Sequence, residues 1–301
     1  MSFTPIFRES TGLNTVIDPL RLPYDPETGI MSLAAAINVV VDDSGMIKRR
    51  KGYTRVQEGS WHSLFYDGSD CVGVKDGDLC VIAEDMSYTS IRSGFSSRVS
   101  YAQVNDSIYY TSPDLFGIVK DGIHISWEAQ EYVGPDTDRE FAPPFPANHI
   151  AFHLSRIWLA LSNFVVASEP FGWSWFDLHR STILLDSYVR MIKPVKDGLY
   201  ISTDKKTYFL SGSQPEEFSL RMVADYPAIE FSAAQQYVEA LEIGMDDPGL
   251  CALWASEKGV CLGTPSGTAI NLTRDRVVYP DEGTRGAGLL VDYNFIHTIN
   301  E

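Results

Sequence analysis

The chain has 301 residues and a mass of 33.5 kDa, with 24 Lys and Arg against 40 Asp and Glu, so its net charge is −16. This acidity excludes a protein whose main task is to grip nucleic-acid backbone, because that binding needs clustered Lys and Arg. A hydrophobic content of 44% excludes global disorder. The 23 Gly, 16 Pro and 12% aromatic residues, with only 21% charged residues, favour an all-β protein with many turns.

Residues 1–35 are predicted to form an extended N-terminal arm outside the folded body, which would occupy residues 36–301. The arm holds four prolines and little periodicity, yet it contains many apolar residues. A long irregular segment with apolar side chains is expected to lie on a partner. We expect subunit contacts through Phe7, Leu13, Val16 and Leu20.

A hairpin is predicted next, in the sequence AINVVVDDSGMIKRR, and it ends in the basic cluster Lys48, Arg49, Arg50 and Lys51. Residues 1–60 contain seven basic and seven acidic residues, so the whole net charge of −16 lies in the remainder. The basic cluster is interpreted either as a solvated strand end or as a contact to an acidic neighbouring subunit. Contact to nucleic acid is a third alternative.

From Trp61 onward, runs of four strand-like segments bounded by Gly, Asp, Asn or Ser recur. The runs begin at Trp61, Val99, Asn148, Val189 and near Ser232, at spacings of 38, 49, 41 and 43 residues. Such spacing is typical of a β-propeller, whose blades are four-stranded sheets of about 40–45 residues. The pairs Asp76-Gly77, Asp121-Gly122, Asp197-Gly198 and Lys258-Gly259 are predicted to supply the positive φ of tight hairpins.

The predicted fold is therefore a single all-β propeller of about six four-stranded blades. Five blades come from the repeated runs, and the last blade would be closed by strands from the N-terminal hairpin and from a C-terminal hairpin in AGLLVDYNFIHTI. Such closure removes exposed sheet edges. Five or seven blades, or a pair of immunoglobulin-like sandwiches, are the alternatives.

The segment 128–147 reads as a long loop with four prolines. Long loops on a rigid scaffold often carry function, so we expect a second subunit contact there, through Phe141 and Phe145.

No pattern in the sequence indicates catalysis, a metal or a cofactor. The four cysteines lack CxxC spacing, and His149 and His153 lack further ligands nearby. Glu169, Asp177, Asp186 and Asp204 are interpreted as turn and cap residues rather than as a pair of glycosidase carboxylates. Aromatic residues including Trp158, Trp173, Trp175 and Trp254 are expected between blades more often than on a sugar-stacking surface.

The run GLNTVIDPLRLPYDPETGIMSLAAAINVVVDDSGMIKRRKGYTRV resembles the N-terminus of bacteriophage virion proteins of the tail-hub and tail-nozzle β-propeller type. The features that carry the resemblance are Asn38-Val39, the turn at Asp42–Gly45, the basic cluster, and Gly52-Tyr53. Later segments, among them FVVASEPFGWSWFD with Ser168-Glu169-Pro170, are similar too.

The resemblance implies a non-enzymatic structural component of a phage tail, assembled as a symmetric ring around or beside the DNA exit channel. Its partners would be copies of itself and other tail proteins, and DNA would pass nearby without specific binding. No secretory signal or membrane span is expected, so the protein would be made in the host cytoplasm and located in the virion. A carbohydrate-binding or carbohydrate-cleaving propeller and a head-to-tail joining protein are the alternatives.

Overall fold

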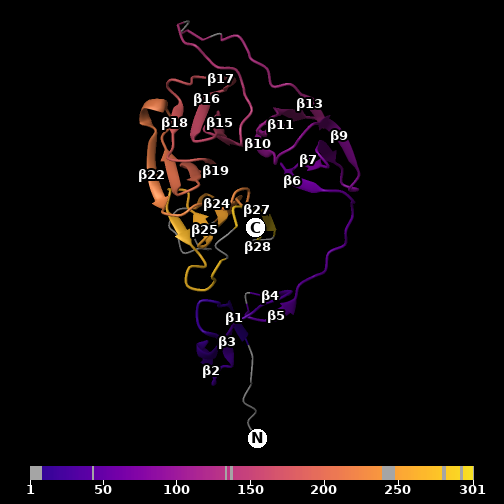
Figure 1. The fold of residues 1–301 in the computed structure, drawn as a ribbon, viewed down its shortest axis with the longest axis vertical. Helices are drawn as coiled ribbons and strands as arrows, with labels where there is room; N and C mark the ends of the chain where they lie inside the picture. The colour runs from indigo at the N-terminus through magenta and orange to yellow at the C-terminus, as the bar shows by residue number, and fades with distance from the viewer. Residues whose placement is uncertain are drawn as a thin grey trace.

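The computed structural model describes residues 9–42, 44–132, 134–135, 138–238, 248–279, 283–291 and 294–300. Within these residues the chain consists of strands and two short 3-10 turns, without an α-helix. Figure 1 shows five sheets arranged around a centre, with the chain passing from one sheet to the next in sequence order. The all-β propeller prediction is confirmed.

Each of the five sheets is an antiparallel meander, and we number them as blades in chain order. Blade 1 contains β6 (Trp61–Tyr66), β7 (Cys71–Lys75), β8 (Asp78–Ile82) and β9 (Tyr88–Ser93). Blade 2 contains β10 (Ser100–Val104), β11 (Ser107–Thr111), β12 (Phe116–Lys120) and β13 (Ile123–Ile125).

Blade 3 contains β14 (His149–His153), β15 (Arg156–Leu161), β16 (Phe164–Glu169), β17 (Gly172–Phe176) and β18 (Thr182–Leu184). Both β17 and β18 pair with β16, so this blade has five strands. Blade 4 contains β19 (Val189–Val195), β20 (Gly198–Thr203), β21 (Thr207–Ser211) and β22 (Ser219–Ala224). Blade 5 contains β23 (Ala234–Val238), β24 (Gly249–Ser256), β25 (Gly259–Gly263) and β26 (Ala269–Asn271).

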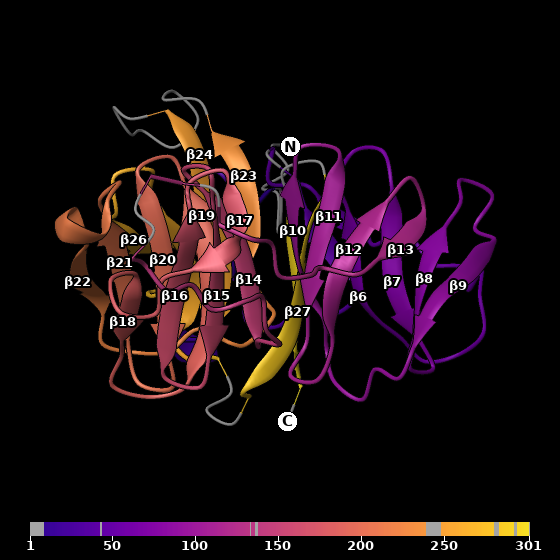
Figure 2. The ribbon, with the colours of Figure 1, turned by 90° about the horizontal axis from the view of Figure 1, so that it is seen from above.

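The first strands of successive blades line the centre, since β10 packs on β14, β14 on β19, and β19 on β23. Because strand direction alternates within a meander, the turns after the first and third strands of all blades lie on one side of the disc. We call this side the turn face; Figure 2 views the disc edge-on.

Buried apolar side chains fill the spaces between neighbouring blades. Four clusters join blades 1 to 2, 2 to 3, 3 to 4 and 4 to 5, and they contain the fully buried Trp158, Trp254, Tyr110 and Tyr200. The interpretation of these aromatic residues as interblade core is thus confirmed, since fully buried rings offer a sugar no stacking surface. Within the described residues no cluster joins blade 5 to blade 1.

The predicted composite sixth blade is not present as one sheet. Both hairpins form, as β4 (Val39–Val41) with β5 (Ile47–Arg49) and as β27 (Arg285–Val291) with β28 (Asn294–Asn300). They are separate two-stranded sheets, and no described strand pairs one with the other. Figure 1 shows β27 and β28 near the centre, while β4 and β5 lie further out, below the ring. We call the region between blades 5 and 1 the open sector.

The predicted arm also differs from expectation, because much of it is folded. The strands β1 (Glu9–Leu13), β2 (Tyr24–Asp25) and β3 (Ile30–Leu33) form a small sheet, with a 3-10 turn over Pro19–Arg21. Local carboxylates order this sequence: Asp18 Oδ1 accepts from Leu20 N and Asp25 Oδ1 from Glu27 N. Such caps replace the regular periodicity that the sequence lacks.

Two of the four predicted hairpin dipeptides occupy the turn positions. Asp76 and Gly77 have φ of 51° and 91°, and Asp121 and Gly122 have φ of 51° and 71°, as a type I′ turn requires. In the other two hairpins the register is shifted by one residue, because Val195 pairs with Gly198 and Ser256 with Gly259. Those glycines are the first residues of their strands.

Hydroxyl groups connect one blade to the next. Thr111 of β11 is fully buried, and its Oγ1 accepts from Ala147 N at 2.8 Å and donates to Ala147 O at 3.0 Å, just before β14. Ser202 Oγ of β20 accepts from Ala228 N at 2.7 Å in the same way, and Ser63 Oγ accepts from Val99 N at 2.9 Å. These bonds satisfy backbone groups that would otherwise be buried without partners.

We expect Thr111→Val to lower the free energy of unfolding by about 1–3 kcal/mol, because the isosteric methyl group leaves the amide and carbonyl of Ala147 unpaired. Urea unfolding followed by tryptophan fluorescence measures the change. Thr89→Val in β9 is the matched control, since Thr89 is exposed and its substitution should change stability little. Equal effects of the two substitutions would contradict the assigned role of Thr111.

Candidate interaction surface

The N-terminal module, residues 9–56, has no apolar core of its own. No apolar side chain of its described residues is buried, and the first buried apolar residue in the described part of the chain is Val72. Eight large apolar side chains of the module are instead exposed: Val16, Leu20, Tyr24, Ile37, Val40, Met46, Tyr53 and Val56. Leu20 is 95% exposed and Ile37 82% exposed. A folded segment that exposes this much apolar surface is typical of a protein–protein contact.

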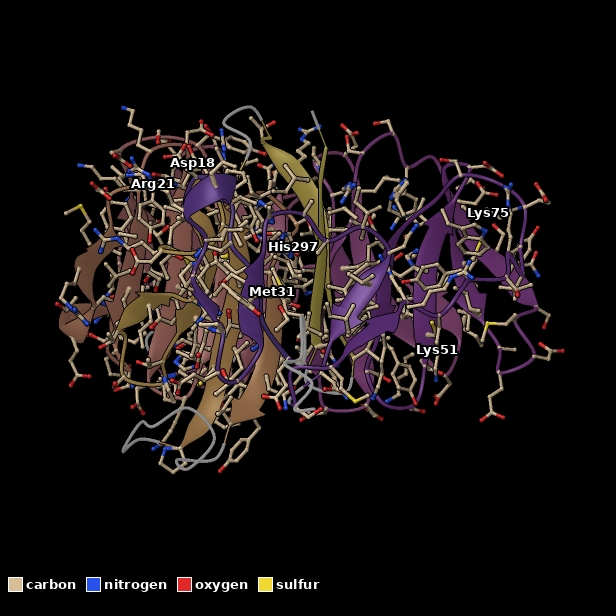
Figure 3. The ribbon with its side chains drawn as sticks, turned by 90° about the horizontal axis from the view of Figure 1, so that it is seen from below. Asp18, Arg21, Met31, Lys51, Lys75 and His297 are labelled. Atoms are coloured by element: carbon tan, nitrogen blue, oxygen red, sulfur yellow. The ribbon has the colours of Figure 1, made fainter. Side chains whose placement is uncertain are left out.

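Backbone hydrogen bonds attach the module to the segment that follows blade 5. Thr15 N donates to Arg276 O at 2.7 Å, and Val278 N donates to Thr15 Oγ1 at 2.9 Å. Within the module, Ser10 N donates to Gly45 O at 2.7 Å, which joins β1 to the β4–β5 turn. The module therefore sits across the outer side of the open sector, where Figure 3 shows it with Asp18, Arg21 and Met31 labelled.

The basic cluster forms a shallow concavity of about 430 Å³ lined by Asn38, Arg49, Arg50, Lys51, Gly52 and Tyr53. Arg50 N donates to Asn38 O at 2.8 Å, and the Arg50 guanidinium lies over the Tyr53 ring at 4.8 Å. Lys48 differs from its neighbours, because it pairs with Asp42 at 2.5 Å and thereby lowers the pKa of that carboxyl. Arg49, Arg50 and Lys51 are exposed, so their charge is available to an acidic partner.

On the turn face of the disc, carboxylates outnumber cations. The described turns of that face hold nine of them, against Lys196 as the one cation of the same turns: Asp67, Asp70, Glu84, Asp85, Asp106, Asp121, Asp197, Glu216 and Glu217. The strand periodicity predicts the turns, but only the propeller arrangement brings them onto one face. The acidic face and the neutral module are therefore separate surfaces.

The structure separates the residues predicted for subunit contacts into two groups. Val16 and Leu20 of the module are exposed, Leu13 is half-buried, and Lys48, Arg49, Arg50 and Lys51 follow on the same module. Phe7 lies outside the described residues. These seven described positions, unlike Phe141 and Phe145, belong to one continuous segment at the open sector.

Phe141 and Phe145 contact their own chain instead. Phe145 packs on Phe176 at 5.7 Å in the core between blades 2 and 3, and Phe141 stacks against Tyr132 at 4.5 Å. The loop that carries them is fixed to blade 3 by Arg139, which binds Glu169 at 2.6 Å and Asp177 at 2.8 Å. Both phenylalanine side chains are half-buried, and their contact with a neighbour stays a prediction.

A buried polar cluster holds the C-terminal hairpin, β27 and β28, to the ring. Glu230, 4% exposed, binds Arg285 of β27 at 3.0 Å and accepts from Tyr188 OH at 3.3 Å. His149 Nε2 lies 3.3 Å from Glu230 Oε1, although without hydrogen-bond geometry. Backbone bonds from Glu230 N to Thr284 O and from Gly286 N to Glu230 O complete the attachment.

Neighbouring charges set the ionisation of this cluster. Burial alone would raise the pKa of the Glu230 carboxyl, but His149 and Arg285 outweigh burial and leave that pKa below its ordinary value.

Burial lowers the pKa of His153, at the end of β14, to about 4, so this imidazole is neutral near pH 7. Sequence reasoning did not find Glu230, because its partners are distant in the chain.

Among the described residues, no group of His, Cys, Asp and Glu has the arrangement of a metal site. None of the four cysteines forms a disulfide, and Cys71 pairs with Ile82 and Cys80 with Gly73, as the turn at Asp76-Gly77 predicts. No helix in the described part of the chain is long and apolar enough to cross a membrane.

Comparisons with known proteins identify no family. No family model matches the chain, and no curated protein matches it. Solved structures similar to the chain are β-propeller-like: BBS1N in complex with ARL6DN has a TM-score of 0.49 and 11% identity, over 85% of this chain and 79% of that one. The WD40 domain of Neurospora crassa Pan2 has a TM-score of 0.46 and 8% identity, over 76% and 68%.

The extracellular domain of BT4673 from B. thetaiotaomicron has a TM-score of 0.48 and 10% identity. It matches 83% of this chain, which spans about a third of that domain's length. At such identities the likeness concerns the fold alone. None of these structures indicates a bacteriophage origin, so the resemblance to tail proteins supports a proposal only.

We expect Glu230→Gln to lower the free energy of unfolding near pH 7 by about 1–3 kcal/mol, because Arg285 loses its charged partner. The carboxylate has a lowered pKa in the folded state, so its contribution is complete above its unfolded pKa of about 4.5 and is lost as the pH falls through the folded value. The stability difference between wild type and variant should therefore shrink in acid.

Urea unfolding at a series of pH values measures this difference. Glu84→Gln is the control, because Glu84 is exposed and should show no such pH-dependent gap. A gap for Glu230→Gln that stays constant down to pH 3 would contradict the charged role of Glu230.

Proposed function

We propose that this protein is a non-enzymatic structural subunit that assembles through its N-terminal module, and that it serves as a ring-forming component of a bacteriophage tail. The finer part of the proposal, a hub or nozzle position in a virion, is supported by the resemblance of residues 12–56 to such tail proteins. The coarser part, assembly, is supported by the module itself.

The observation that carries the proposal is the absence of buried apolar side chains from the module's described residues. A small sheet normally needs a covered apolar face to be stable, because the conformational entropy of ordering it must be offset by burial. Here eight large apolar side chains face solvent. Contact with neighbouring subunits would cover them and supply that burial.

The charge distribution fits a place beside the DNA path. The turn face carries nine carboxylates in its described turns. An acidic surface repels DNA phosphates, so DNA would pass it without binding. The neutral module with its basic cluster would meet protein neighbours instead. Partners would be copies of the chain and other tail proteins, in a particle assembled in the host cytoplasm.

We expect the full-length protein to form a discrete oligomer at high concentration, and Leu20→Asp with Ile37→Asp to weaken this association at least about tenfold. Each change places a carboxylate in a face that association would bury, and a tenfold loss corresponds to about 1.4 kcal/mol. Sedimentation velocity over a wide concentration range measures the association.

Leu184→Asp is the matched control, since Leu184 is 73% exposed on β18 of blade 3 and lies outside the module. Its association should equal that of wild type. A wild-type protein that stays monomeric at every concentration, or a double variant that associates normally, would contradict assembly through the module.

A further inference from the structure

Blade 3 interrupts the acidic turn face. Its two turns on that face are Leu154-Ser155 and Pro170-Phe171, and they contribute none of the nine carboxylates. Leu154 is 50% exposed and Phe171 is 78% exposed. Exposed apolar side chains that gather at one place on a charged face are typical of a surface that a partner covers.

The two turns lie against each other and form one patch. Ser155 O accepts a hydrogen bond from Phe171 N at 2.9 Å and another from Trp173 Nε1 at 3.0 Å. Trp173 is half-buried and packs edge-on against the half-buried Phe152, with ring centroids 6.0 Å apart. We call Leu154 and Phe171, with these two rings beside them, the blade 3 patch.

The backbone of the patch has a conformation that its residues disfavour. Leu154 has a φ of 48° and Phe171 a φ of 59°, in the left-handed region where a bulky side chain is crowded. Most other residues with positive φ in the described chain are Gly, Asn, Asp or Ser. Glycine or asparagine would form these two turns with less strain. Strain retained at such positions points to a use for the side chains themselves.

Carboxylates of the two neighbouring blades flank the patch. The described turns of blades 2 and 4 supply five of the nine on this face: Asp106, Asp121, Asp197, Glu216 and Glu217. Ion pairs with Lys120 and Arg180 compensate Asp106 and Glu216, whereas the other three have no ion-pair partner among the described residues. Lys196 is the one cation of the same turns. The patch is therefore an apolar centre with an acidic rim, the usual anatomy of a protein interface.

The N-terminal module carries the complementary surface. Its concavity is lined by the basic residues 49–51 and by Tyr53, and Ile37 directly precedes the lining residue Asn38. Tyr53 is 77% exposed and Ile37 is 82% exposed. Apolar side chains beside exposed cations match an apolar patch with an acidic rim, and such complementarity selects both the partner and its orientation. Arginine guanidinium groups also stack favourably on an aromatic ring such as that of Phe171.

One chain does not bring the two surfaces together. Figure 1 shows the module at one end of the long axis of the molecule and β15, β16 and β17 of blade 3 at the other end. The hydrogen bond of 2.7 Å from Thr15 N to Arg276 O attaches the module to the segment that follows blade 5. Contact between the module and the blade 3 patch therefore requires two copies.

We infer that the N-terminal module of one copy docks on the turn face of a second copy, with its basic concavity over the blade 3 patch. Each copy offers a module at one end and a patch at the other, so the contact is heterologous and repeats until a ring closes. Blade 1 holds the remaining four carboxylates of the turn face, and this contact leaves them uncovered. The inference rests on the proposed assembly through the module and identifies the surface that the module meets.

Substitution of the patch is the first test. Leu154→Asn with Phe171→Gly places in each turn a residue that suits positive φ, so we expect the full-length variant to unfold in urea at a midpoint equal to or above that of wild type. Its self-association, measured by sedimentation velocity, should nevertheless fall at least about tenfold, because the contact loses its apolar centre. Leu184→Asp is the matched control, since Leu184 is 73% exposed on β18 of the same blade but lies outside the turns of the turn face.

Mixing two defective variants tests whether the two surfaces meet. Ile37→Asp with Tyr53→Asp alters the module and leaves the patch intact, whereas the patch variant keeps an intact module. Each variant alone should associate weakly. An equimolar mixture should form 1:1 mixed dimers and nothing larger, because each pair has one functional contact that cannot propagate. Native mass spectrometry with one variant isotopically labelled identifies these dimers.

The results that would overturn the inference are distinct from those that would overturn the proposed function. A patch variant that associates as wild type does, or a mixture without mixed dimers, would overturn the inference and leave assembly through the module intact. A wild-type protein that stays monomeric at every concentration would overturn both.

Discussion

The structure depends on the pairing of backbone polar groups in the dry space between blades. Each time the chain leaves an outer strand and returns to the centre, its amides and carbonyls enter a region filled by Trp, Tyr and Leu side chains, where an unpaired group is costly. Thr111, Ser202 and Ser63 solve this with hydroxyl groups that bind the returning backbone. Apolar packing joins the blades, and these hydroxyl groups pair the backbone that crosses from one blade to the next.

Local signals in the sequence were sufficient for the blades but not for their closure. Alternating apolar residues and turn dipeptides are short-range features, so the strands of blades 1, 2 and 4 could be predicted almost residue by residue. The prediction of one four-stranded sheet in the open sector was wrong. No local feature of the sequence shows whether two hairpins more than 200 residues apart pair with each other. The role of the buried hydroxyl groups could not be predicted from the sequence either, because a Ser or Thr at a strand end is equally common in solvent.

The candidate surface was predictable in part, for the same reason. The prolines and apolar residues of the first segment indicated contact with a partner, although not the small sheet that local carboxylates build from it. The contacts of the long loop with its own chain were not predicted, because sequence does not show that Arg139 and Phe176 bind it to blade 3. Glu230 was missed because His149, Tyr188 and Arg285 converge on it from separate elements.

The attachment of the N-terminal module has a consequence for the order in which the molecule is built. Arg276 donates to Thr11 O across 265 residues of sequence. A chain is synthesised from its N-terminus and its units fold as they emerge, so β1 must wait for its binding site until nearly all the blades have been made.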